Sequence, residues 1–361
     1  MLYCIVSLLF FIVLGLLGFS SLDNRKFYAI AYCIIVCFWG LSYSYAPDTN
    51  GYMEYFDAEV RTLSQGIDIN AHGFEPGFNI FASICKSIIP EYVFFQFALF
   101  TIEVALVIAG LRKLLTKEQA KFVIVLLFFL YPTMLSATRQ GVSIALIIYA
   151  LQFILKRKFK LYLLLIAVAY TFHHSSLIAV PLLLVYYLEK RFSSNKLLLG
   201  ILIISDLCWL AGISFSQYLD GVLGTILEDG SGIEKYTMYI NDEESAISNY
   251  GLAKIIEINI AYCGFIYFRS KQQNPNALFT TFLVLYTIIG MMLGGILAHR
   301  FLYYFIIIYY VCVFIGINAI IKRNGDTKYA CVSYSLLSVY MFWFYIIKGG
   351  MIQNEYIFLP S

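Results

Sequence analysis

Three polar clusters interrupt apolar stretches of this chain where helical runs reverse direction. Arg139 follows one such run, His173 and His174 follow the next, and His299 with Arg300 repeats the pattern further on. Ionisable side chains are expensive inside a bilayer, so their presence in apolar stretches indicates function. Guanidinium groups remain charged and bind phosphate through two parallel hydrogen bonds, whereas a histidine ring exchanges protons near neutral pH. These residue types predict chemistry on a phosphate-bearing substrate.

The composition indicates the solvent that surrounds these clusters. Of the 361 residues, 61% are hydrophobic and only 13% are charged, and the mean hydropathy is +0.78. Soluble domains are close to half apolar and a quarter charged. The sequence therefore predicts an all-α polytopic membrane protein with about 12 transmembrane helices, within one integral-membrane domain that covers residues 1–361. The predicted spans are 2–20, 27–46, 92–111, 122–136, 141–155, 161–173, 176–188, 197–215, 251–268, 277–297, 301–321 and 329–347.

Lysine and arginine determine the predicted orientation. Alternate loops hold 18 of the 25 basic residues, against four acidic residues. Because cytoplasmic loops are enriched in lysine and arginine, we assign these loops to the cytoplasm and both termini to the outside. The basic loops are thus a topological signal and do not indicate nucleic-acid binding.

Two long outer loops, 47–91 and 216–250, are rich in acidic residues and tyrosines. Tyrosine rings stack on sugar faces and carboxylates accept hydroxyl hydrogens, so either loop is suited to a glycan. The alternative for the second loop is a solvated acidic surface with interfacial tyrosines. Within the first loop, residues 77–89 alternate polar and apolar positions at helical spacing, which predicts an amphipathic helix on the outer face.

Several other classes of site have no signature in this chain. The eight cysteines all lie in apolar runs without a CxxC pair, so they predict neither a disulfide framework nor a zinc site. Walker loops, HExxH and GxSxG motifs do not occur either. We therefore predict no metal and no cofactor.

The predicted spans beside Arg139 and His173 are only about 13–15 residues long, or roughly 20 Å, which is short for a bilayer. Their polar ends should therefore lie below the outer surface, in a cavity that opens to the outside. Each end also begins a helix, at about Gly141, Ser176 and Phe301, and free N–H groups at helix N-termini favour anions. The alternatives are an arginine that snorkels to headgroups and a histidine that serves a core hydrogen bond. We predict that Arg139, His173 and Arg300 converge.

Four motifs in this order resemble a known family. They are PDTNGY at 47–52, FEPGF at 74–78, TRQGVSIAL at 138–146 and AVAYTFHHSSLIAVP at 167–181, with a looser match at Arg300 followed by FLYYF. Over about residues 45–310 the chain resembles the EpsG-type, Wzy-like polymerases of bacterial O-antigen, capsule and exopolysaccharide. The FHxS pattern falls on Phe172, His173 and Ser175, which selects His173 rather than His174.

The resemblance implies a GT-C-like bundle and a metal-independent glycosyltransferase without a cofactor. The site would face the periplasm or cell exterior from the bacterial cytoplasmic membrane. The donor would be a growing glycan on undecaprenyl pyrophosphate, and the acceptor another lipid-linked repeat unit. Further partners would be the bilayer, a chain-length regulator and a repeat-unit flippase.

The predicted site residues fall into three groups by role. Base or sugar-positioning groups are Asp48 and Glu75, with His173 as either base or ligand; pyrophosphate ligands are Arg139, Gln140, His173 and Arg300; tentative glycan contacts are Tyr52 and His299. Cations and helix N-termini would stabilise the charge that develops on the leaving diphosphate.

The alternative function is transport, in which a flippase would use the cationic cavity to hold the lipid-linked oligosaccharide. A transporter exposes its site to both sides of the membrane, often through repeats in both halves. Here the polar ends all fall on the predicted outer side, which favours an enzyme.

Overall fold

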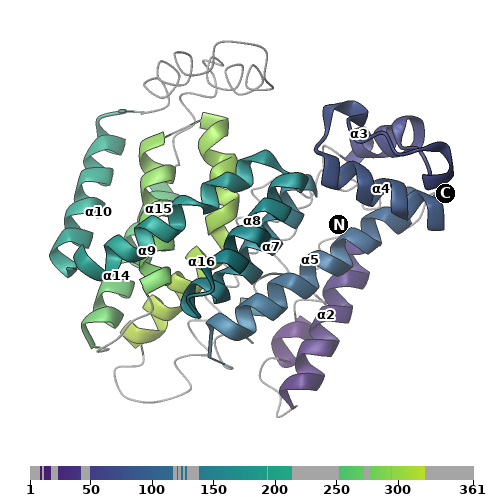
Figure 1. Ribbon diagram of the computed structural model, residues 1–361. Helices are drawn as coiled ribbons and strands as arrows, with labels where there is room; N and C mark the ends of the chain where they lie inside the picture. Colours follow the sequence, from purple (N-terminus) through teal and green to yellow (C-terminus); the bar gives the residue numbers. More distant parts are fainter. Residues whose placement is uncertain are drawn as a thin grey trace. The chain divides into compact units, whose positions relative to one another are not determined.

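The computed structural model describes residues 9, 12–17, 23–41, 49–116, 120, 123–124, 127, 138–192, 194–213, 252–271, 277–293 and 295–321, and within these ranges the chain is helical and has no strand. It divides into two compact units, one made of Met1–Val180 with Leu336–Ser361 and the other of Pro181–Ser335. Figure 1 shows their helices coloured along the chain. The predicted all-helical class is confirmed.

Four helices form the core of the first unit: α2 (Asn24–Gly40), α5 (Tyr92–Leu114), α7 (Thr138–Leu155) and α8 (Phe159–Phe172). Helix α5 packs against α2 and α7, and α7 packs against α8. The backbones of α5 and α7 come very close, because a Cβ added at Gly110 would lie 2.7 Å from the carbonyl oxygen of Ile148. Small residues at such crossings allow helices in membranes to approach closely.

A compact loop connects α2 to α5. It contains α3 (Thr49–Glu54), a π-helical turn (Tyr55–Glu59), 3-10 turns at Leu63–Gln65 and Ala71–Gly73, and α4 (Pro76–Ile88). The helix predicted over 77–89 is therefore confirmed.

Helix α4 buries part of its polar face together with Phe78 and Cys85. Asn79 and Ser83 are 1% and 2% exposed, whereas Ile80, Ile84 and Ile88 are 38%, 40% and 65% exposed. Asn79 can be buried because its amide group forms hydrogen bonds with the preceding loop through both its nitrogen and its oxygen. The isoleucine stripe is left on the surface.

The second unit contains α9 (Pro181–Phe192), α10 (Asn195–Leu210), α14 (Leu252–Lys271), α15 (Ala277–Ile288), a π-helical turn (Ile289–Leu293) and α16 (Gly295–Ile321). Helices α14 and α16 cross at Gly264 and Gly316, where a Cβ on either residue would come within 3.0 Å of the backbone of the other. Nearby, the rings of Tyr286 and Tyr309 stack with centroids 3.8 Å apart.

Three predicted helix starts are wrong. Helix α7 begins at Thr138 rather than Gly141, and α16 begins at Gly295 rather than Phe301. After His173 the chain forms a 3-10 helix, His174–Ala179, and the next α-helix begins only at Pro181. Proline at the first helical turn fits there because its missing N–H is not needed. Ser175 and Ser176 thus lie inside the 3-10 turn and do not cap an α-helix.

Two helices in the described part of the chain are long and apolar enough to cross a membrane. They are α5, with 23 residues and a mean hydropathy of 2.1, and α7, with 18 residues and a mean hydropathy of 1.4. Shorter apolar helices lie at Phe159–Phe172, His174–Leu184, Leu278–Met291 and Phe301–Gly316. The count of about 12 spans therefore remains a prediction. The spans predicted at 329–347 and for most of 122–136, and loop 216–250 entirely, lie outside the described residues.

Candidate functional site

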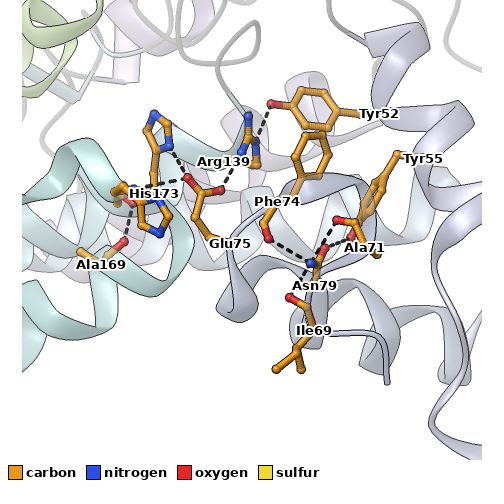
Figure 2. A network of polar contacts seen from close by, with 12 residues as sticks. Tyr52, Tyr55, Ile69, Ala71, Phe74, Glu75, Asn79, Arg139, Ala169 and His173 are labelled. Atoms are coloured by element: carbon orange, nitrogen blue, oxygen red, sulfur yellow. Dashed lines mark hydrogen bonds and ion pairs between the residues drawn. The ribbon is translucent and has the colours of Figure 1, made fainter. Parts of the chain in front are cut away.

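The carboxylate of Glu75 joins a guanidinium and an imidazole from distant parts of the first unit. Its Oε2 lies 2.6 Å from Nη1 of Arg139, and its Oε1 lies 2.8 Å from Nδ1 of His173. The backbone N–H of His174 also donates to Oε1, at 3.3 Å. Figure 2 shows Glu75 between the guanidinium and the imidazole, with one oxygen directed to each. Charge-assisted hydrogen bonds of this kind are about twice as strong as neutral ones.

Three different elements bring these residues together. Glu75 is the N-cap of α4, with an extended backbone, and Pro76 begins the helix. Arg139 is the second residue of α7, and His173 ends α8, where its N–H donates to the carbonyl oxygen of Ala169 at 2.9 Å. The site is therefore formed where three helix ends meet.

Glycine 77 allows the first turn of α4 to lie directly on the last turn of α8. A Cβ at Gly77 would come within 2.8 Å of the carbonyl oxygen of Thr171. Any larger residue would push α4 away from α8 and so lengthen the distance from Glu75 to His173. The FEPGF motif thus places the carboxylate, the helix start and the close contact within four residues.

Arg139 is held on three sides. Besides Glu75, its Nε donates to the Tyr52 hydroxyl at 3.4 Å, and its Cζ lies 4.0 Å from the ring centre of Phe74. A guanidinium on an aromatic face gains roughly 0.5–2 kcal/mol. Its side chain is 17% exposed, compared with 5% for Glu75 and 9% for His173. Of these three side chains, Arg139 is the most accessible to a ligand.

Electrostatics keep Glu75 ionised. Burial raises the pKa of this carboxyl, but the hydrogen bond with His173 and the charge of Arg139 outweigh burial and lower the pKa to about 2. A general base works best when its pKa is near the working pH. Glu75 is therefore better suited to orient Arg139 and His173 than to accept a proton.

Asn79 fixes the loop that carries Tyr52 and Phe74. Its amide nitrogen lies 2.8–3.2 Å from the carbonyl oxygens of Ile69, Ala71 and Phe74, and its Oδ1 accepts a 2.6 Å hydrogen bond from Tyr55. The same contacts are visible in Figure 2. Two turns further along α4, the Lys86 amine donates to the carbonyl oxygens of Phe56 and Asp57. The polar face of α4 therefore positions the aromatic side of the site.

The structure brings together four of the predicted site residues: Tyr52, Glu75, Arg139 and His173. Gln140 follows Arg139 in α7 and is 2% exposed. One helical turn on, the Ser143 hydroxyl ties α7 to α8 by donating to the carbonyl oxygen of Ala169. The convergence of Arg139 and His173 is thus observed, whereas their catalytic roles remain predictions.

Three predicted residues are not placed at this site. Asp48 lies outside the described residues. His299 and Arg300 belong to the second turn of α16, in the other unit, and their side chains also fall outside the description. Their convergence with Arg139 remains a prediction.

Sequence reasoning missed the contribution of Phe74. Its position beside Glu75 in FEPGF was the available signal, since an aromatic residue next to the paired acid reaches the same guanidinium. Within the described ranges, no group of three or more His, Cys, Asp or Glu side chains is arranged to hold a metal ion.

Comparison with known families places this chain. A family model for the EpsG family matches residues 25–358, which is nearly the whole chain. The chain belongs to the EpsG family. This is a Wzy-like polymerase family, so the chain is a polysaccharide polymerase-like membrane protein. Searches of curated proteins and of solved structures each found no match.

Proposed function

We propose that this EpsG family member polymerises undecaprenyl-pyrophosphate-linked repeat units on the outer face of the bacterial cytoplasmic membrane. The observation that carries the proposal is the convergence of Arg139 and His173 on one buried carboxylate, at the ends of two apolar helices. Ionisable groups beside apolar helices are rare in membrane proteins and usually mark a substrate or ion site. A lipid diphosphate provides both the anion and the apolar tail that this position favours.

In the proposed reaction, a hydroxyl of the acceptor glycan attacks the anomeric carbon of the donor. The new bond joins that carbon to the hydroxyl oxygen, and the bond from the carbon to the diphosphate oxygen breaks. The electron pair leaves with the diphosphate, and the hydroxyl proton passes to a base. The diphosphate therefore gains charge during the step and must be stabilised.

Arg139 is the group that we propose stabilises this charge. A guanidinium has five N–H donors, and two are engaged by Glu75 and Tyr52, so donors remain for phosphate oxygens. His173, when protonated, is a second cation on the same carboxylate. The negative charge of Glu75 orients both groups before the substrate arrives, which saves reorganisation during the reaction. Gln140 and Arg300 are further proposed pyrophosphate ligands, Tyr52 and His299 are proposed glycan contacts, and Asp48 stays a proposed base or sugar-positioning group.

The test is extension of synthetic undecaprenyl-pyrophosphate repeat units by purified protein in vesicles, followed by linkage analysis. Arg139→Lys should lower the extension rate by about 100-fold or more, because a lysine loses the bidentate geometry. Arg112→Lys is the matched control, since Arg112 also lies on an aromatic ring, that of Tyr28 at 4.5 Å, but belongs to the last turn of α5 and not to the cluster of Glu75, Arg139 and His173.

Two results would overturn the proposal. One is wild-type protein that moves lipid-linked repeats across the vesicle membrane without lengthening them, which would indicate a transporter. The other is Arg139→Lys protein that extends repeats as fast as Arg112→Lys protein at equal amounts in the membrane.

A further inference from the structure

A second histidine–carboxylate pair lies on the loop that packs against Arg139. Nδ1 of His72 is 2.5 Å from Oε1 of Glu59, and the two side chains are 47% and 40% exposed. His72 belongs to the 3-10 turn Ala71–Gly73, and Glu59 ends the π-helical turn Tyr55–Glu59. In contrast to His173, this imidazole is open to a substrate that arrives from outside the protein.

The backbone at His72 is strained. Its φ of 54° and ψ of 16° lie in the left-handed region, which non-glycine residues rarely adopt, and Gly73 follows with a φ of 63°. Hydrogen bonds on both sides hold the turn, from the Gly73 N–H to Asn70 and from the Phe74 N–H to Ala71. Strain of this kind costs about 1–3 kcal/mol and concentrates at functional sites.

Phe74 connects this pair to the cationic site. The ring of His72 packs edge-on against Phe74 with centroids 4.6 Å apart, and Cζ of Arg139 lies 4.0 Å from the same ring centre. The imidazole and the guanidinium are therefore no farther apart than the sum of these two distances. Figure 2 shows Phe74 beside Arg139, with Tyr55 beyond it. Tyr55 also packs against Phe74, at 4.8 Å.

This separation suits a glycosyl transfer. The base lies about 3 Å from the attacking hydroxyl, the hydroxyl about 3 Å from the anomeric carbon, and the leaving oxygen about 3 Å from its cation. A base and a diphosphate-binding arginine therefore need to lie within about 10 Å of each other, on opposite sides of the reacting carbon. His72 and Arg139 both pack against Phe74, and the sum of their distances to its ring centre satisfies this distance requirement.

We propose that His72 is the general base that accepts the proton of the acceptor hydroxyl, with Glu59 as its orienting partner. The inference rests on the polymerase function proposed above. A carboxylate that accepts the Nδ1 hydrogen leaves Nε2 as the proton acceptor. As the new C–O bond forms, the hydroxyl proton moves to Nε2, and the positive charge on the ring is stabilised by Glu59. Glu75, whose two oxygens already bind cations, is left to orient Arg139 and His173.

The test variant is His72→Gly, assayed in the repeat-unit extension reaction with and without added imidazole. Glycine adopts a positive φ without strain, so the turn should be retained while the ring is removed. We expect kcat to fall by about 100-fold or more with the KM for the donor little changed, and imidazole to restore activity in proportion to its concentration. Glu59→Gln should lower kcat less, because the base is retained but less well oriented.

Two controls separate chemistry from folding. His72→Asn retains a residue that tolerates the left-handed region but supplies no base, so it should be as inactive as His72→Gly. Arg61→Gln changes an exposed charge in the same loop and should leave the rate unchanged.

Three outcomes would overturn the inference while wild-type protein still extends repeats. The first is a rate for His72→Gly within about two-fold of wild type, which would mean that the His72–Glu59 pair is only a surface ion pair. The second is an active His72→Asn variant, and the third is a loss in His72→Gly that imidazole does not restore; either would indicate a structural role in the turn. If wild-type protein itself does not extend repeats, the proposed function fails instead.

Discussion

Two buried glutamates of the first unit meet the beginning of α7 and have opposite surroundings. Glu75, 5% exposed, binds Arg139 and His173 through separate oxygens. Glu103 of α5 is 1% exposed, and neither of its carboxyl oxygens has a hydrogen-bond partner among the described residues. Its carboxyl lies against Gly141, where a Cβ would come 2.7 Å from Oε1. The two carboxyls are thus similarly buried, but within the described part of the chain Glu75 is paired through both oxygens and Glu103 through neither.

Glu75 and Glu103 are similarly buried, so the side chains around each carboxyl, and not its burial, distinguish the two positions. Glu75 caps a helix in a loop, where two other helix ends can reach it. Glu103 is near the middle of α5, where its carboxyl faces Gly141 of α7. A buried carboxylate is stabilised by opposite charges and hydrogen bonds, and without them its ionised form is costly. We therefore assign orientation of the proposed substrate-binding cations to Glu75.

The largest effect should come from Glu75→Gln. Removing one member of a buried charged network costs about 3–5 kcal/mol, because the remaining charges lose their partner. We expect the free energy of unfolding in detergent to fall by that order and repeat-unit extension to drop by about 100-fold or more. Normal extension at a normal protein level would contradict the assigned role.

The pH dependence of stability should follow from the same pairing. The pKa of Glu75 is lowered from 4.5 to about 2 in the folded protein, so its stabilisation is complete above pH 4.5 and is lost as the pH falls towards 2. Measured by denaturant unfolding, the stability difference between wild type and Glu75→Gln should shrink over this range. If the stability difference between wild type and Glu75→Gln stays constant from pH 6 to pH 3, Arg139 and His173 do not lower the pKa of Glu75.

Gly77→Ala should have an intermediate effect. The added methyl group would overlap Thr171, and overpacking of this kind costs about 1–3 kcal/mol. Because α4 would move away from α8, the Glu75–His173 contact should lengthen and extension should slow. Gly51→Ala is the matched control, since nothing lies within 4 Å of a Cβ added there. Equal thermal stability and extension rate in the two alanine variants would exclude the close contact as a requirement.

The smallest effect should come from Glu103→Gln. The amide has nearly the same shape, and no paired charge is lost, so we expect stability within about 1 kcal/mol of wild type and extension within about two-fold. The rate and the unfolding free energy should be measured beside those of Glu75→Gln. A loss as large as that of Glu75→Gln would mean that both glutamates belong to the same machinery.

Much of the fold was predictable because it is local. Apolar periodicity gave the helices around α5, α7 and α8, and the polar-apolar alternation gave α4. Helix starts were less predictable, since a 3-10 turn after His173 and an early start at Thr138 depend on hydrogen bonds that composition does not encode. The inward polar face of α4 was also out of reach, because it follows from carbonyl oxygens that the folded loop presents to Asn79.

The sequence by itself determined the apolar helical class, the set of polar residues worth testing and, through its motifs, the preference for His173 over His174. Only the tertiary structure decided that Glu75 joins Arg139 and His173, which are 64 and 98 residues away from it. It also decided that Phe74 links Arg139 to His72. The physical reason is that spacing along a chain reports local conformation, whereas the pairing of charges depends on which helix ends are packed together.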